Sequence, residues 1–124
     1  MTLFGNSLGH FKAIVDINPR GPKADQRNSP PFNGIRWSFV YAEDIDSLGL
    51  EKAPHSDVWP DFLDQSGNSI ETGIPLIGTY SAKMHIVFPH MIPKHLARLK
   101  IGTQFFCMEG HRQMAIGTVT HLNI

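Results

Sequence analysis

Residues 27–41 read RNSPPFNGIRWSFVY, a turn-rich segment that leads directly into an alternating strand. The two prolines and the following Asn-Gly pair favour turns. Beyond them, Ile35, Trp37, Phe39 and Tyr41 place an apolar side chain at every second position. Such alternation is typical of a strand with one buried face. A turn followed by an aromatic strand favours an all-β fold.

The same period-two pattern recurs on both sides of this segment. It predicts strands at Phe11–Ile17, Ala82–Phe88, Phe105–Glu109 and Met114–His121. The last two runs are joined across Gly110 and His111, which predicts a hairpin. Short strands separated by many glycines and prolines indicate a barrel or a sandwich.

Two segments depart from the alternating pattern. Segment 43–80 is long and acidic, and a structureless loop of that length is uncommon in a compact domain. We therefore expect local strands or a packed excursion there, held to the barrel by Trp59 and Phe62. Leu96 and Leu99 have helical spacing, which predicts a short helical turn within residues 94–100.

Length and composition indicate one ordinary globular domain, residues 1–124. The chain is 41% hydrophobic and 18% charged, which is too apolar for a disordered protein. Its single cysteine, Cys107, excludes an internal disulfide framework. We see neither a secretory signal nor an apolar run long enough to span a membrane, so we expect a cytoplasmic location without membrane association.

The zero net charge hides an uneven distribution. Residues 43–71 carry one basic and eight acidic side chains, a net charge of −7, and both flanking regions are mildly basic. Phosphate neutralisation dominates affinity for nucleic acids, so this balance disfavours non-specific binding to them.

Two stretches carry a resemblance to a known family. Arg27–Phe39 contains an Arg, a Ser-Pro pair, a Phe and a Gly-Ile-Arg turn that enters a strand, and Phe105–Val119 contains a Phe strand followed by Glu-Gly-His-Arg. Their order and spacing resemble the third, C-terminal domain of translation elongation factor Tu, with Ile35 where that family usually has Tyr and Trp37 where it has Pro. The resemblance implies a small closed six-stranded antiparallel β-barrel with an acidic loop insertion at 43–80.

The resemblance also implies a binding role. In the family this domain helps to hold the T stem of aminoacyl-tRNA and contacts protein partners. The implied RNA- or partner-binding positions are Arg27, Asn28, Ser29, Glu109, Gly110 and Arg112, with Lys94 as a further candidate. Alternatively, Arg27 and Arg36 hydrogen-bond loop carbonyls. Trp59 and Phe62 could anchor a protein interface, or could simply close one end of the barrel.

Enzymatic functions have less support in the residues. No Gly-rich loop ending in Gly-Lys-Ser or Gly-Lys-Thr is present, so we expect neither nucleotide binding nor GTP hydrolysis. His85, His90 and His95 are spaced five residues apart, unlike close zinc-binding pairs, and we expect no metal and no cofactor. Cys107 fits a small buried hydrophobe. Its alternative is a nucleophile approached by His85 or His121.

These observations favour a non-enzymatic binding module that engages a protein partner, with a link to translation. Binding of tRNA or other structured RNA through the terminal hairpin and the Arg27 loop is the alternative. A small His-assisted hydrolase is a further alternative from a different functional class.

Overall fold

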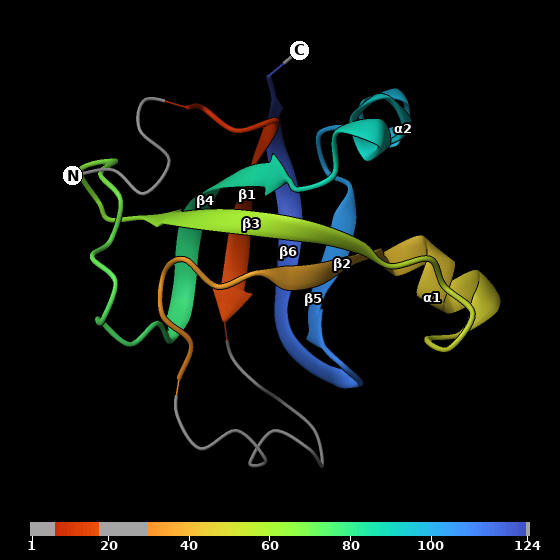
Figure 1. Ribbon diagram of the computed structural model, residues 1–124, viewed down its shortest axis with the longest axis horizontal. Coiled ribbons are helices and arrows are strands. Elements are labelled where there is room, and N and C mark those ends of the chain that lie inside the picture. Colours follow the sequence, from red (N-terminus) through yellow and green to blue (C-terminus); the bar gives the residue numbers. More distant parts are fainter. Residues whose placement is uncertain (1–6, 18–29, 124) are drawn as a thin grey trace.

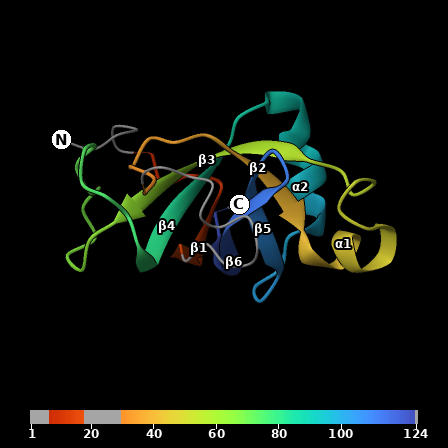
Figure 2. The ribbon, with the colours of Figure 1, turned by 90° about the horizontal axis from the view of Figure 1, so that it is seen from below.

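The computed structural model describes residues 7–17 and 30–123. In chain order the elements are β1 (Phe11–Ile17), β2 (Trp37–Tyr41), α1 (Ala42–Leu48), β3 (Ser56–Leu63), β4 (Gly78–Ile86), the 3-10 helix η2 (Pro89–Met91), α2 (Ile92–Arg98), β5 (Gln104–Glu109) and β6 (Arg112–Leu122). The six strands in these residues form a closed barrel in the order β1-β4-β3-β2-β5-β6, and every pair is antiparallel (Figure 1). Helices α1 and α2 lie on the same side of the barrel in both ribbon views (Figure 2).

Apolar side chains at alternate positions of the strands point inward and fill the barrel. The pattern in β1 buries every second residue from Phe11 to Ile17, as the sequence predicts. Aromatic rings occupy the centre: Phe39 stacks on Phe105 with ring centroids 4.7 Å apart, and Phe11 meets both rings edge to face. Aromatic pairs in these arrangements add stability beyond the area that they bury.

Most predicted elements are confirmed, with shifted ends. The strand expected from Ile35 begins at Trp37, and the strand expected from Ala82 begins four residues earlier and ends at Ile86. The β5–β6 hairpin turns at Gly110, whose φ of 59° suits glycine. The helical turn expected in residues 94–100 is α2, which begins two residues earlier with proline in its first turn.

The prediction of an acidic loop insertion at 43–80 is wrong for much of that segment. The segment contains nearly all of α1, the whole of β3 and the start of β4. Strand β3 pairs with β2 on one side and with β4 on the other, so the barrel could not close without it. Its last four residues, from Pro60 to Leu63, are all buried, so the strand lacks the period-two pattern that marks the others. Segment 43–80 does contain the local strands that we expected there.

A buried asparagine attaches the loops to β3. Asn33 donates its side-chain amide to the carbonyl oxygens of Phe62 (3.0 Å) and Ile70 (2.8 Å) and accepts the Phe62 backbone N–H at 2.9 Å. The Asp61 carboxylate, 1% exposed, lies 3.4 Å from the same amide and accepts the Ser69 hydroxyl at 2.9 Å. These bonds explain why the outward side of β3 is covered at this point.

Candidate functional site

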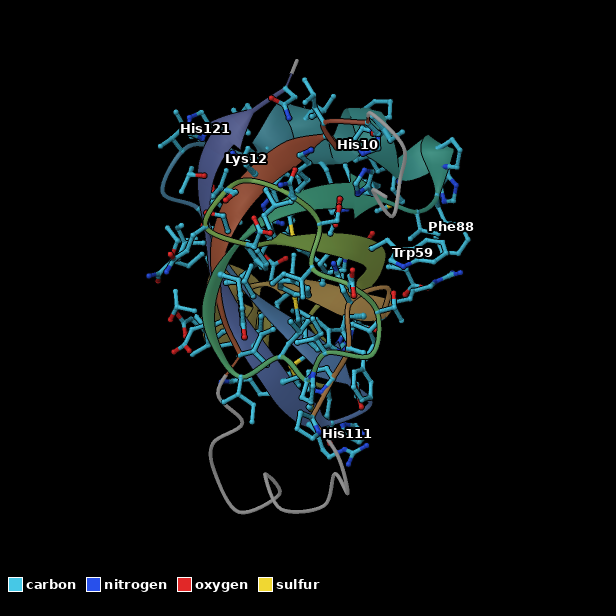
Figure 3. The ribbon with its side chains drawn as sticks, turned by 90° about the vertical axis from the view of Figure 1, so that its left-hand side faces the viewer. His10, Lys12, Trp59, Phe88, His111 and His121 are labelled. Carbon is cyan, nitrogen blue, oxygen red and sulfur yellow. The ribbon has the colours of Figure 1, made fainter. Side chains whose placement is uncertain are left out.

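The residues expected at the terminal hairpin do come together, but they bind one another. Trp37 donates its indole N–H to Glu109 Oε2 at 2.8 Å, and Arg112 forms an ion pair with Glu109 Oε1 at 3.5 Å. Glu109 therefore supports a buried tryptophan as well as its hairpin partner. Gly110 forms the turn, beside the exposed His111 that is labelled in Figure 3.

The other half of that predicted site cannot be compared with it. Arg27, Asn28 and Ser29 lie outside the described residues. The further candidate, Lys94, is an exposed residue of α2 that lines a small cavity, and Figure 1 shows α2 at the other end of the barrel from the β5–β6 turn.

The prediction of Phe62 as an interface anchor is wrong. Its side chain is 0% exposed and packs edge to face against Trp37 and Tyr80 in the barrel interior. Trp59, three residues earlier, points outward and is 38% exposed. Even-numbered positions of β3 face inward, so a correct strand prediction would have separated these two aromatics.

Trp59 belongs to a surface that we call the aromatic surface, made of Arg36, Asp57, Trp59 and Phe88. Trp59 donates its indole N–H to the Gly34 carbonyl at 2.7 Å. Arg36 donates to Asp57 Oδ2 from Nε (2.9 Å) and from NH2 (2.7 Å), and its guanidinium lies 5.1 Å from the centroid of the Phe88 ring. Phe88 is 42% exposed, and Figure 3 labels Trp59 and Phe88 at the right-hand edge of the protein.

These contacts hold each side chain of the aromatic surface in one orientation. Asp57 and Trp59 occupy the same outer face of β3, and Arg36 directly precedes β2, the strand paired with it. Arg36 thus bonds a carboxylate and the ring of Phe88, and no carbonyl bond is among its described contacts. Tryptophan, phenylalanine and arginine are enriched at protein interfaces. Pre-ordered side chains lose little entropy when a partner binds.

Part of the acidic segment is paired with arginines from other elements. Arg98 of α2 forms ion pairs with Glu43 and Asp44 of α1, and its guanidinium lies 3.8 Å from the ring centroid of Tyr41. The hydrogen bond from Arg98 holds the pKa of Asp44 below its usual value. Three of the eight acidic side chains of residues 43–71, Glu43, Asp44 and Asp57, are therefore paired with arginines.

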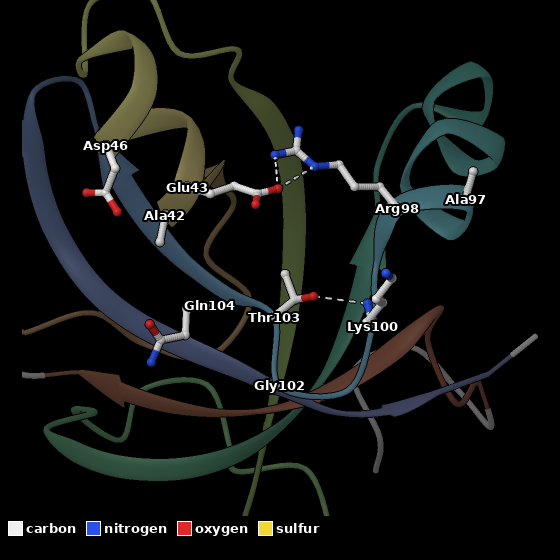
Figure 4. A pocket seen from close by; sticks show the side chains of 9 residues that line it. All are labelled: Ala42, Glu43, Asp46, Ala97, Arg98, Lys100, Gly102, Thr103 and Gln104. Carbon is white, nitrogen blue, oxygen red and sulfur yellow. Dashed lines mark hydrogen bonds and ion pairs between the residues drawn. The ribbon is translucent and has the colours of Figure 1, made fainter.

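An open polar pocket of about 630 Å³ lies between α1, α2 and the start of β5 (Figure 4). Glu43 and Arg98 form one of its walls and bond each other, and Lys100 and Thr103 are bonded through the Lys100 backbone N–H. The charged groups of Glu43 and Arg98 therefore satisfy each other at this wall.

A chain of three hydrogen-bonding side chains lies next to a smaller cavity of about 170 Å³. Tyr41 Oη and His95 Nδ1 are 2.8 Å apart, and His95 Nε2 lies 2.9 Å from Ser56 Oγ. His95 and Ser56 are 5% and 9% exposed. A serine beside a histidine that contacts a third group matches the general layout of nucleophilic catalysis.

The third group of this cluster, however, favours a structural role. Burial raises the pKa of Tyr41 to about 12, so its phenol stays neutral. In catalytic triads a carboxylate at the second ring nitrogen orients the histidine and stabilises its charged form. The neutral phenol supplies no such charge, and burial lowers the pKa of His95. The cluster therefore attaches α2 to β2 and β3.

Cys107 and the two histidines expected to assist it lie on different sides of the barrel wall. Cys107 is fully buried in the core, and burial raises the pKa of its thiol. His85 and His121 belong to outward positions, so the predicted alternative of a cysteine nucleophile assisted by them is wrong. In residues 7–17 and 30–123, no group of three His, Cys, Asp or Glu side chains could hold a metal ion.

Stability should fall in mild acid because of the buried His95. Burial and the nearby Arg98 lower the pKa of His95 in the folded protein below the ordinary value of 6.5. As pH falls through that value, the unfolded chain binds a proton that the folded protein excludes, so the free energy of unfolding decreases. Urea unfolding followed by tryptophan fluorescence between about pH 7 and about pH 5 should show this.

The matched control for this pH effect is His95→Gln, which keeps polar atoms at the site but does not titrate. Its stability should depend less steeply on pH than that of the wild type, by at most about 1.4 kcal/mol per pH unit. Part of the dependence should remain, because burial also lowers the pKa values of His10 and His85. Equal slopes for the two proteins would contradict the contribution of His95.

No helix among the described residues is long and apolar enough to cross a membrane. A comparison of the sequence with protein-family models found no match, and a comparison with curated proteins found no significant match.

Proposed function

We propose that the chain is a non-enzymatic binding module that engages a protein partner through the aromatic surface. The observation that carries this proposal is the fixed arrangement of Trp59, Arg36 and Phe88. Two large aromatic side chains are more than one third exposed, yet each is held by a contact to a neighbouring group. Exposed and pre-ordered aromatic and arginine side chains are the usual centres of protein interfaces.

We further propose that the barrel is of the type found in the third domain of elongation factor Tu, and that the partner is linked to translation. The resemblance of Arg27–Phe39 and Phe105–Val119 supports this lineage. The end of Arg27–Phe39 enters β2, which begins at Trp37, and Phe105–Val119 lies in the β5–β6 hairpin. A closed barrel of six antiparallel strands is consistent with the same lineage.

A protein is a better candidate than an RNA as the binding partner of this module. At the hairpin, Glu109 and Arg112 bind each other, which leaves the arginine less able to contact a phosphate. The net charge of zero also disfavours the many phosphate contacts on which RNA affinity depends. The hydrolase alternative is disfavoured because the group beside His95 Nδ1 is the neutral phenol of Tyr41 and not a carboxylate.

Trp59→Ala should strongly reduce capture of the partner. Immobilised wild-type chain, exposed to cell lysate, should retain a protein that mass spectrometry identifies. Truncating a central interface tryptophan typically costs about 2 kcal/mol or more, which corresponds to a loss of affinity of roughly thirtyfold. Titration of the purified partner against wild type and variant would measure this loss.

The matched control is Ile101→Ala, which removes a side chain that is 71% exposed on the connection between α2 and β5. It should bind like the wild type, and circular dichroism should show both variants folded. If RNA alone is recovered, and raising the salt concentration abolishes its recovery, the proposal is wrong. Equal retention of the protein by wild type and Trp59→Ala would exclude the aromatic surface.

A further inference from the structure

Three cationic or titratable side chains form a row across the outside of the barrel, which we call the cationic row. Lys12 of β1 is directly opposite Lys83 of β4 and, on its other side, opposite His121 of β6. All three positions are at least partly exposed. Figure 3 shows Lys12 and His121 at neighbouring places on this side of the protein.

The lysine pair is unfavourable for the fold by itself. Side chains directly opposite each other on antiparallel strands have Cβ atoms about 5 Å apart, and like charges there repel. Among the described residues, no hydrogen bond or ion pair neutralises Lys12 or Lys83. Asp61 is opposite Lys83 on β3, but its buried carboxylate accepts the Ser69 hydroxyl and lies beside the Asn33 amide.

His85 lies between the cationic row and the aromatic surface, and its Nε2 lies 3.1 Å from Ser7 Oγ. This residue is directly opposite Trp59 in the β3–β4 pair, and it shares the outer face of β4 with Lys83, two residues earlier. His85 Nδ1 also lies 3.1 Å from the Trp59 carbonyl oxygen. One occupant could therefore contact the aromatic rings and the lysines together.

From these contacts we infer that the partner presents an acidic segment to the cationic row while an apolar part of the same partner covers Trp59 and Phe88. The inference rests on the proposed function and adds the chemistry of the partner. Carboxylates would relieve the repulsion between Lys12 and Lys83. The aromatic surface contains one acidic residue, Asp57, and its carboxylate is already paired with Arg36. Asp57 is therefore compatible with an acidic partner.

An acidic protein fits this face better than a nucleic acid does. Stacking of bases requires open aromatic faces. Here Arg36 lies over the ring of Phe88, and the indole of Trp59 is fixed to the Gly34 carbonyl. Two lysines are also few for a phosphate backbone, whose binding grows with the number of charges neutralised.

Fluorescence anisotropy with defined probes tests the inference. The probes are a labelled peptide of alternating glutamate and leucine, the same peptide with lysine in place of glutamate, and an oligouridine of equal length. The full chain should bind the glutamate peptide in preference to the other two. Added salt should weaken this binding, because charged surface contacts are screened.

Lys12→Glu is the decisive variant. It should weaken binding of the glutamate peptide by about tenfold, since an attractive charge becomes repulsive. The variant should melt no lower than the wild type, because the new carboxylate would face Lys83 as an opposite charge. Lys100→Glu makes the same change of charge at an exposed position after α2, and it should bind within about twofold of the wild type.

The outcomes separate this inference from the proposed function. Equal binding of the glutamate peptide by wild type and Lys12→Glu, or no binding at all, overturns the inference. Tighter binding of oligouridine that Lys12→Glu abolishes also overturns it, in favour of a nucleic acid. If Trp59→Ala abolishes capture of a protein partner that Lys12→Glu still binds fully, the proposed function stands and the acidic chemistry is wrong. If Lys12→Glu loses binding of the glutamate peptide while Trp59→Ala still binds that peptide fully, the cationic row is supported as a binding site. The same result refutes the aromatic surface as a binding site.

Discussion

Replacing Gly117 by alanine should cost the barrel about 3 kcal/mol or more of its free energy of unfolding. Gly117 of β6 is directly opposite Phe105 of β5, and the Phe105 ring occupies the space above the glycine. An added Cβ would lie closer than 3.0 Å to three atoms of that ring. The ring has little freedom to move, because Phe39 stacks on it and Phe11 meets its edge.

The size of this effect follows from the close packing of protein interiors, where one additional methyl group strains its neighbours. Folded domains are stable by only about 5 to 15 kcal/mol, so the loss should be large enough to lower the melting temperature by many degrees. Urea or thermal unfolding followed by circular dichroism would measure it. Thr118→Ala, at the next position of β6, is half-buried and outward-facing and should change stability far less.

A double variant tests the cause of the Gly117 effect. Phe105→Leu removes the ring atoms that an alanine at position 117 would strike, so the two changes should not be additive. Gly117→Ala should be much less harmful in the Phe105→Leu background than in the wild type. If the losses of the single variants simply add, a clash with the Phe105 ring is not the reason.

The second large effect is expected for Asn33→Ala. The Asn33 side chain uses both its amide and its oxygen to bind β3 and the following loop, and it is 1% exposed. Alanine would leave the Phe62 N–H without its described partner and would remove a donor from two carbonyls. Each buried group left unsatisfied costs about 1 to 3 kcal/mol, so the total should be about 3 kcal/mol or more.

Two control variants sharpen the Asn33 experiment. Asn33→Asp keeps an acceptor for Phe62 but loses the amide donors and adds a negative charge beside Asp61, so it should not rescue stability. Asn68→Ala truncates an exposed asparagine in the loop after β3 and should have little effect. Chemical denaturation of the three variants gives the comparison. A small loss in Asn33→Ala, similar to that of Asn68→Ala, would show that water replaces the missing bonds.

The strands that the sequence predicts well are those with one face in the core and one in water. Phe11–Ile17 is the clearest example, because its polar residues alternate strictly with buried ones. Strand β3 could not be bounded in the same way. Pro60 lies within it, and the carboxylate of Asp61 is buried under loop residues that come from distant parts of the chain. A local pattern of apolar and polar residues cannot show that residues distant in the sequence bury a strand position.

The candidate site was predicted only in part, for related reasons. Trp59 is exposed because it occupies an outward position of β3. Its neighbours Arg36 and Phe88 come from other parts of the chain, so their proximity depends on how the strands pair. Lys12 and Lys83 are visible in the sequence as outward residues of two strands, whereas their direct opposition depends on the pairing register. The buried His95 did leave a signal, since it lies four residues from both Met91 and Leu99, the apolar residues that flank α2.

The closed strand order also determines when the barrel can form. Strand β1 is hydrogen-bonded to β6, so residues 11–16 must meet residues 116–122 before the wall is complete. Contacts this far apart along the chain carry a high loop-closure cost and slow the search for the native fold. During synthesis the first strand emerges long before its final neighbour exists. Closure of this barrel must therefore follow completion of its last strand, and until then β1 has an unpaired edge open to wrong partners.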